Sequence, residues 1–82
     1  MLSKEEKKLF EKVIKEMDYW SEKCDFDEIT FSVQMLSIFM SHRIVVTAFN
    51  LNTNTHTHFV VDKKDIDYIN NLFEEAVRQV KE

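Results

Sequence analysis

The spacing of the apolar residues changes twice along this chain of 82 residues, and this change constrains the fold more than any single motif does. Apolar residues recur every three or four positions over residues 4–23 and again over residues 62–82, which is the period of an amphipathic helix. Over residues 29–35, apolar and polar residues alternate instead, as is typical of a half-buried strand. The sequence therefore predicts a helix at each end of the chain with strands between them.

Two further segments continue the strand pattern. The stretches "RIVVTAFNL" (residues 43–51) and "THTHFVVD" (residues 55–62) predict a second and a third strand, joined by a loop at residues 52–54. Ser3 followed by Glu6 is a capping-box signature for the first helix, and Asp62 followed by Asp65 marks the start of the second. The resulting order is α-β-β-β-α in a single domain over residues 1–82.

We expect an α+β fold in which two amphipathic helices pack on one face of a three-stranded antiparallel sheet. Short connections at both ends of the sheet favour this two-layer sandwich. The alternative is one helix on each face, which would cover both sides of the sheet. The two arrangements differ in whether one sheet face remains open to a partner.

The register of the strands decides which residues such an open face presents. Three-residue loops at residues 41–43 and 52–54 would direct the odd-numbered strand residues into the core and the even-numbered ones outward. The outward face would then carry a larger apolar cluster than an ordinary monomer exposes. With the adjacent His58, this cluster forms the predicted partner-binding surface: Leu36, Ile38, Met40, Ile44, Val46, Ala48, His58 and Val60.

The chain contains no glycine and no proline, and this limits the chemistry it can perform. Phosphate-cradling loops, dinucleotide fingerprints and nucleophile elbows depend on glycine, so these enzyme classes are excluded. The turns must instead use Asn, Asp, Ser and His, which tolerate a positive φ angle better than most residues do. The net charge of −4 disfavours a nucleic acid or an anionic membrane as the partner.

Other sequence features bear on the location of the protein. No apolar run approaches the roughly 20 residues of a membrane span, and the N-terminus has no signal-peptide pattern. The single cysteine, Cys24, cannot form a disulfide within the chain, which favours the reducing cytoplasm. The neighbouring Asp25 and Asp27 disfavour a thiolate, so we expect Cys24 to be structural rather than reactive.

The segment "NTNTHTHFVV" places His56 and His58 on the same face of a strand. Two imidazoles can bind Zn²⁺, but a structural zinc site needs four protein ligands and a catalytic one about three. In the predicted register the neighbours of the two histidines are Gln34, Ala48 and Asn50, so only a two-fold dimer with four histidines would complete a metal site. We expect these histidines to lie at the rim of a contact surface.

The α-β-β-β-α order, with both helices on one side of the sheet, is similar to the double-stranded-RNA-binding domain over nearly the whole chain. That family binds RNA through its first helix, a histidine-bearing loop between the first two strands, and lysines at the start of the last helix. His42 in "SHR" and Lys63 and Lys64 in "DKKD" stand at the corresponding places. The resemblance implies duplex RNA as an alternative partner. A looser similarity connects the chain with small acidic inhibitors made by phages, anti-CRISPR proteins among them.

These patterns favour a small acidic cytoplasmic protein that binds protein and is not an enzyme. The partner is either a second copy, giving a homodimer, or a larger protein that the chain inhibits by stoichiometric binding. We expect no cofactor, no membrane and no small-molecule substrate. Nucleic-acid binding, and metal binding by His56 and His58, are the alternatives.

Overall fold

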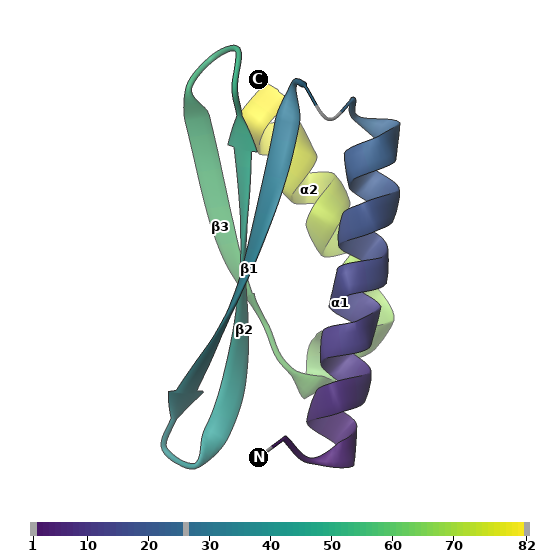
Figure 1. Cartoon of the computed structure of the whole chain (residues 1–82), viewed down its shortest axis with the longest axis vertical. Helices are drawn as coiled ribbons and strands as arrows, with labels where there is room; N and C mark the ends of the chain where they lie inside the picture. The colour runs from purple at the N-terminus through teal and green to yellow at the C-terminus, as the bar shows by residue number, and fades with distance from the viewer. Residues whose placement is uncertain (1, 26, 82) are drawn as a thin grey trace.

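A computed structural model of the chain describes residues 2–25 and 27–81. The helices and strands follow one another as α1 (Lys4–Lys23), β1 (Ile29–Ile38), β2 (Ser41–Asn50), β3 (Thr55–Val61), the 3₁₀ helix η1 (Lys63–Tyr68) and α2 (Ile69–Lys81). The strands form one antiparallel sheet with β2 in the middle (Figure 1). The predicted α-β-β-β-α order is confirmed. Within the described residues, no helix is both long enough and apolar enough to cross a membrane.

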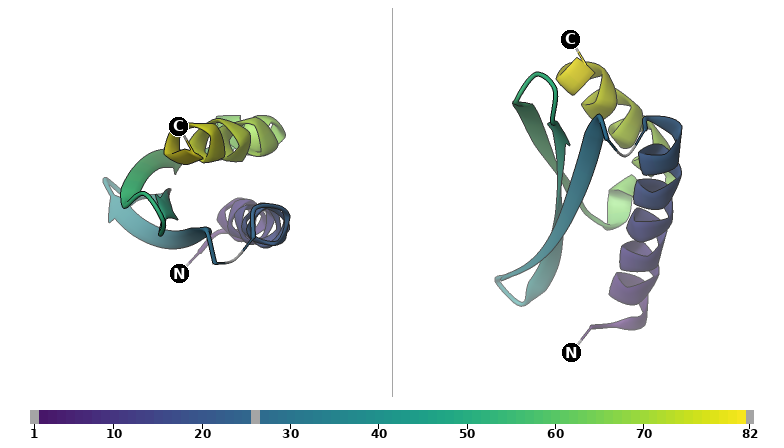
Figure 2. Two further views of the ribbon diagram at one scale, coloured as in Figure 1. Left: turned by 90° about the horizontal axis from the view of Figure 1, so that it is seen from above. Right: turned by 45° about the horizontal axis from the view of Figure 1, so that its top comes forward.

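Both long helices lie on the same side of the sheet. Seen from above, the sheet curves around α1 and α2, and the described chain places no helix on its other side (Figure 2). α1 packs on α2 and β1, whereas α2 packs on β3 and β2. The predicted two-layer arrangement is therefore confirmed, and the alternative with one helix on each face is wrong.

The core is built around Phe73 of α2, which is fully buried. Its ring contacts Phe31 of β1 and Phe59 of β3, and the ring centroids are 5.4 Å apart in both pairs. The apolar stripes of the two helices supply seven further buried residues: Leu9, Val13 and Trp20 from α1, and Ile69, Ala76, Val77 and Val80 from α2. The helical periodicity of the sequence thus corresponds to the two buried helix faces.

The observed strand register differs from the predicted one. A two-residue turn at residues 39–40 joins β1 to β2, so residues 41–43 begin β2 instead of forming the turn. The second loop spans residues 51–54. These two connections reverse the orientation of β2 relative to the prediction, and its even-numbered residues face the helices.

Packing gives a physical reason for this orientation of β2. The side chains that it buries include Ile44, Val46 and Ala48, which are all apolar. The opposite orientation would bury Thr47, whose hydroxyl costs free energy to bury without a hydrogen bond. A two-residue turn with positive φ angles also matches the right-handed twist of the paired strands.

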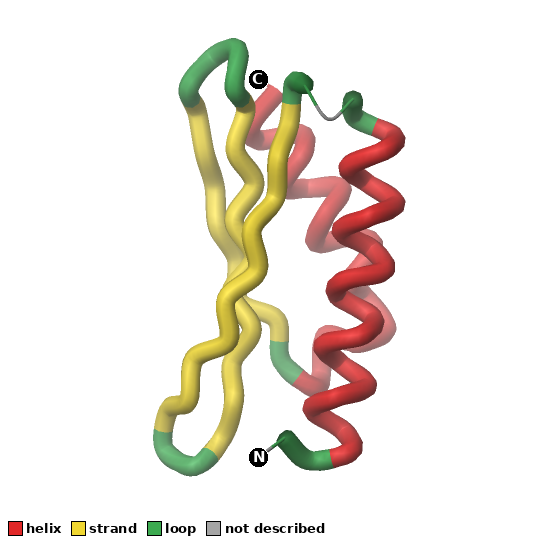
Figure 3. The backbone as a smooth tube through the Cα atoms, viewed as in Figure 1, coloured by secondary structure: helices red, strands yellow, loops and turns green. Residues whose placement is uncertain are grey.

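The positive φ angles of the described residues occur in loops and turns, which are green in Figure 3, and residues other than glycine adopt them because the chain has none. Asp25 (φ 70°) precedes β1 and Asn54 (φ 58°) precedes β3, and both belong to the residue types that we expected there. Phe39 (φ 48°) and Met40 (φ 67°) make the turn between β1 and β2. The prediction that Asn, Asp, Ser or His would make every such turn is wrong at this one.

Glu6 joins the start of α1 to the sheet. Its carboxylate accepts a hydrogen bond from the backbone N–H of Ser3 at 2.9 Å, and Ser3 Oγ accepts one from the Glu6 N–H, which confirms the predicted capping box. The other carboxylate oxygen accepts from the backbone N–H of His42 at 3.0 Å and lies 2.5 Å from the His42 ring Nδ1. These interactions, with the Ser3 N–H first, lower the pKa of Glu6 to about 2.

Asn50 joins the opposite end of the sheet to α2. This residue is only 1% exposed, and its Nδ2 donates to the carbonyl oxygen of Val80 at 3.1 Å. Its Oδ1 accepts from the backbone N–H groups of Asn52 and Thr53 at 2.9 and 3.2 Å. A single buried amide therefore shapes the loop after β2 and holds the end of α2 against the sheet.

Candidate functional site

The sheet face that points away from α1 and α2 is the main candidate for a working surface, and we call it the open face. Side chains alternate along each strand, so the register assigns its members. They are Thr30, Ser32, Gln34, Leu36 and Ile38 from β1, Ser41, Arg43, Val45, Thr47 and Phe49 from β2, and His56, His58 and Val60 from β3.

Charged side chains are nearly absent from the open face. Among the residues just assigned to it, Arg43 is the single Lys, Arg, Asp or Glu, although these types make up 32% of the chain. Its Nη1 donates to Oδ2 of Asp62 at 2.7 Å, so its charge is partly neutralised. Depletion of charge, more than hydrophobicity, distinguishes the centre of a protein interface from the rest of a protein surface.

Apolar side chains lie at the centre and near one end of the open face. In the central row, Val45 pairs across the strands with Val60, which is 49% exposed. At the end near the loop after β2, the ring of Phe49 stacks on that of His56 with the centroids 6.4 Å apart. The adjoining loop residue Leu51 is 51% exposed.

The opposite end of the sheet carries the turn between β1 and β2, whose residues Phe39 and Met40 we call the hairpin tip. Phe39 is 97% exposed and Met40 101%, so neither side chain packs on its own chain. Leu36 and Ile38 beside the tip are 44% and 43% exposed. Next to the tip, the backbone N–H of His42 donates to Glu6 of α1, and Met40 lines a depression together with Ser3 and Glu6. The tip is therefore an apolar projection at the end of the open face.

Three of the predicted partner-binding residues lie in the core instead. Ile44 is 2% exposed, and Val46 and Ala48 are fully buried, because the even-numbered side of β2 faces the helices. Their predicted place on an exposed surface is wrong. The other predicted residues are exposed: Leu36, Ile38, His58 and Val60 on the open face, and Met40 at the hairpin tip.

The sequence prediction missed Val45 and Phe49 on the open face and Phe39 at the tip. The pattern of β2 contained a signal for the first two, because Arg43 and Thr47 share their odd-numbered side and polar residues mark the outward side of a strand. No comparable signal marks Phe39, since large non-glycine residues are uncommon at positive φ angles.

His56 and His58 are both exposed on the open face, as the sequence predicted. Their cross-strand partners are Phe49 and Thr47 rather than the even-numbered residues of β2. Across residues 2–25 and 27–81, no three His, Cys, Asp or Glu side chains gather so that they could hold a metal ion. Within that part of the chain, a zinc site at His56 and His58 would need ligands from a second chain.

Cys24 is buried at the end of α1, with 6% of its surface exposed. Burial raises the pKa of its thiol above the ordinary value, and the nearby Glu28 raises it further, against the opposing charges of Lys81 and Lys23. The raised pKa agrees with the prediction of a structural thiol. The main physical cause is burial, however, and not the neighbouring aspartates that the sequence suggested.

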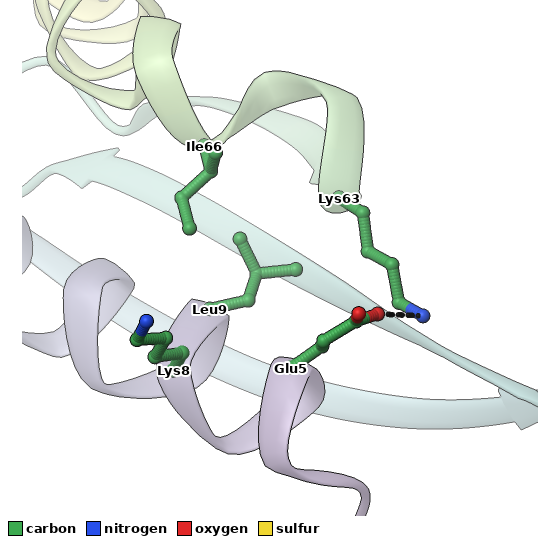
Figure 4. A pocket seen from close by; sticks show the side chains of 5 residues that line it. All are labelled: Glu5, Lys8, Leu9, Lys63 and Ile66. Atoms are coloured by element: carbon green, nitrogen blue, oxygen red, sulfur yellow. Dashed lines mark ion pairs between the residues drawn. The ribbon is translucent and has the colours of Figure 1, made fainter.

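A hollow of about 280 Å³ lies between α1 and η1. Leu9 and Ile66 face each other across it, and Lys63 reaches Glu5 at its rim with the Nζ and Oε2 atoms 2.8 Å apart (Figure 4). A hydrogen bond from Lys63 is the main cause that lowers the pKa of Glu5. The five lining residues include no hydroxyl, thiol or imidazole, and the carboxylate of Glu5 is paired with the ammonium group of Lys63.

The residues behind the similarity to the RNA-binding domain do come together in the fold. His42, Lys63 and Lys64 line one depression beside the start of α1, together with Glu6 and Asp62. Carboxylates accompany the cations there: Glu6 contacts His42, Glu5 contacts Lys63, and Asp62 contacts Arg43. Phosphate groups would have to compete with these carboxylates, which weakens the case for RNA at this surface.

Comparison of the chain with models of protein families, with curated proteins and with solved structures finds no match.

Proposed function

We propose that this chain is a non-enzymatic protein-interaction module that uses the open face as its contact surface, and that the partner is a second copy of the chain. The observation that carries the proposal is the composition of the open face. It has one charged side chain, Arg43, in a protein that is 32% charged, and it leaves Val60, Leu36 and Ile38 between 43% and 49% exposed.

The charge distribution favours self-association through this face. The chain has a net charge of −4, so two copies repel each other over most of their surfaces. The open face contributes no carboxylate, and Arg43 is paired with Asp62 within its own chain. Two open faces can therefore meet without bringing acidic groups of the two copies together.

The size of the open face is sufficient for a stable dimer. Three strands of up to ten residues cover about 34 Å by about 14 Å, or about 480 Å² before the relief of the side chains is counted. Adding a fully exposed Phe and Met from the hairpin tip brings the contribution of each copy to about 800 Å². A standard specific interface buries about 800 Å² per partner.

The two sheets would pack face to face, with the helices on the outside of the dimer. Such a pairing buries the apolar centre of each open face, where Val45 and Val60 lie side by side. Sheets that pack in this way are about 10 Å apart, with strand directions within about 30° of each other. A two-fold axis makes the same patch serve both copies, as in most homodimers.

Val60→Asp tests the proposal. Val60 is half exposed, so the change should leave the fold intact while it places a carboxylate in the dimer interface of both copies. The matched control is Asn70→Asp, which adds the same charge at an exposed position of α2. Light scattering after gel filtration should give a dimer for the unchanged chain and the control, and a monomer for Val60→Asp.

Two outcomes would refute the proposal. One is an unchanged chain that remains monomeric at all accessible concentrations, and the other is a dimer that Val60→Asp does not weaken. A shift titration with duplex RNA at low salt addresses the alternative partner. We expect no binding there, and tight binding that Lys63→Ala and Lys64→Ala abolish would favour RNA instead.

A further inference from the structure

The hairpin tip is built in a way that folding alone does not explain. A two-residue turn with a positive φ angle at both positions is most stable with Asn-Gly or a similar pair. This chain instead places Phe39 at φ 48° and Met40 at φ 67°. Large side chains in this region of φ cost free energy, and such strain is found where function requires it.

Burial of a large apolar side chain can compensate for such backbone strain, but the side chains of the tip are exposed. Phe39 and Met40 are 97% and 101% exposed, so burial within their own chain returns no hydrophobic stabilisation. Of the four described residues with a positive φ angle, Asp25 and Asn54 are polar types that tolerate it, whereas the tip pair are not. The tip residues gain stabilisation only if another surface covers them.

A second copy offers a suitable surface if the strands of the two open faces run in opposite directions. Consider a two-fold axis that crosses the strands at the row containing Val45. Along the strand, the tip is then about 16 Å from the axis on one side, and Phe49 is about 14 Å from it on the other. The rotation exchanges the two sides, so the tip of one copy lies over Phe49 and the adjoining Leu51 of the other.

This arrangement places apolar side chains against apolar side chains at the centre of the face and at the tips. In the rows between them, Arg43 lies opposite Thr47 and Leu36 lies opposite Ser32. At the axis, Val45 and Val60 of one copy meet the same residues of the other. At both ends, the tip meets the aromatic ring of Phe49 and the exposed Leu51. With strands in the same direction, the axis would run along β2 and place Arg43 of one copy against Arg43 of the other, which the antiparallel arrangement avoids.

We infer that each hairpin tip is the anchor of an antiparallel two-fold dimer and packs on Phe49 and Leu51 of the second copy. This inference rests on the proposed function, because it specifies how the two open faces meet. It assigns to Phe39 and Met40 the role of apolar side chains that fill a partner surface, the type of residue on which interface affinity depends most.

The first test replaces the tip with the turn that folding prefers. In the double variant Phe39→Asn/Met40→Gly, the monomer should resist denaturant better than the unchanged chain does, because the backbone strain is relieved. The same variant should raise the dissociation constant of the dimer by about 30-fold or more. Asp25→Gly is the matched control, since it relieves a positive φ angle of 70° in the loop before β1 and should leave the dimer unchanged. An unweakened dimer in the double variant would overturn the inference.

The second test measures the contact directly by thiol cross-linking. Within one chain, the tip lies about 30 Å from Phe49 along the hairpin, so a short cross-linker cannot join the two positions of the same copy. In a Cys24→Ala background, the variant Phe39→Cys/Phe49→Cys lacks two of the contact side chains, so it is studied at concentrations where light scattering shows that it is still a dimer. There it should cross-link into covalent dimers. Phe39→Cys/Asn70→Cys should not, because Asn70 lies on α2.

The outcomes of the cross-linking test separate the two proposals. If the cysteine variant is a dimer in solution and gives no cross-link, the tip contact is overturned and the proposed function stands. A chain that sediments as a monomer overturns the proposed function, and the inference with it. If the Phe39→Cys/Phe49→Cys variant gives covalent dimers and the Phe39→Cys/Asn70→Cys control does not, the proposed function and the tip contact are both supported.

Discussion

Val45 and Val46 are neighbours on β2 whose side chains point to opposite sides of the sheet, so the same substitution should have opposite effects at the two positions. Val46 is fully buried beneath the helices, whereas Val45 lies on the open face. Replacing each by aspartate therefore tests the strand register directly. We expect Val46→Asp to unfold the protein and Val45→Asp to leave it folded as a monomer.

The magnitudes make this contrast large. Val46→Asp loses the burial of an apolar side chain, about 1.5–3 kcal/mol, and a buried unpaired carboxylate costs several kcal/mol more. The whole stability of a domain of this size is about 4–12 kcal/mol. Val45→Asp loses mainly the strand preference of valine, about 1 kcal/mol.

Urea unfolding followed by circular dichroism measures both variants, at protein concentrations low enough for association to contribute little. The expected result is a cooperative transition for Val45→Asp at a slightly lower midpoint and no folded baseline for Val46→Asp. If Val46→Asp folded and Val45→Asp did not, the observed register would be refuted and Val46 would lie on the exposed face. Equal destabilisation of both variants would contradict an open face without a covering layer.

Three further predictions concern polar groups. The pKa of Glu6 in the folded chain is about 2, below its ordinary value of 4.5, so its contribution to stability is complete above pH 4.5 and is lost as the pH falls toward 2. Glu6→Gln should therefore flatten the fall of the urea midpoint over that range, and an equally steep fall would contradict the role of the carboxylate. Asn50→Leu should lower the free energy of unfolding by about 1–3 kcal/mol in urea titrations, because it leaves the N–H groups of Asn52 and Thr53 without their acceptor and removes one of the two side-chain donors to the carbonyl of Val80, the other being Thr55. A change below about 0.5 kcal/mol would contradict that role. Zn²⁺ should leave the melting temperature unchanged, and a rise that His56→Ala and His58→Ala abolish would instead show a metal site shared between chains.

The order of the elements and the side of the sheet on which the helices lie could be predicted from the sequence. Both depend on patterns repeated over many residues, such as the helical stripe that ends in Phe73, Val77 and Val80. The start of α1 could also be predicted, because the capping pair Ser3 and Glu6 is a local signal. A single atypical residue does not change a pattern that is repeated over so many positions.

The register of β2 was harder to predict because it depends on the two turns. Both sides of β2 carry apolar residues, so Val45 and Val46 are equally plausible core residues when the strand is considered alone. A turn made by Phe39 and Met40 contradicts residue preferences, and local preferences cannot identify it. The turn at Phe39 and Met40 and the register of β2 could not be predicted from the sequence, and both belong to the surface to which we assign a partner-binding role.

The measurement that tests the central claim most directly is an isotope-filtered nuclear Overhauser experiment on an equal mixture of labelled and unlabelled chains. Contacts between copies should appear at the methyl groups of Val45 and Val60, and at the side chains of Phe39 and Phe49. Contacts between copies confined to the exposed sides of α1 and α2, or none at a concentration where the chain is folded, would contradict the account.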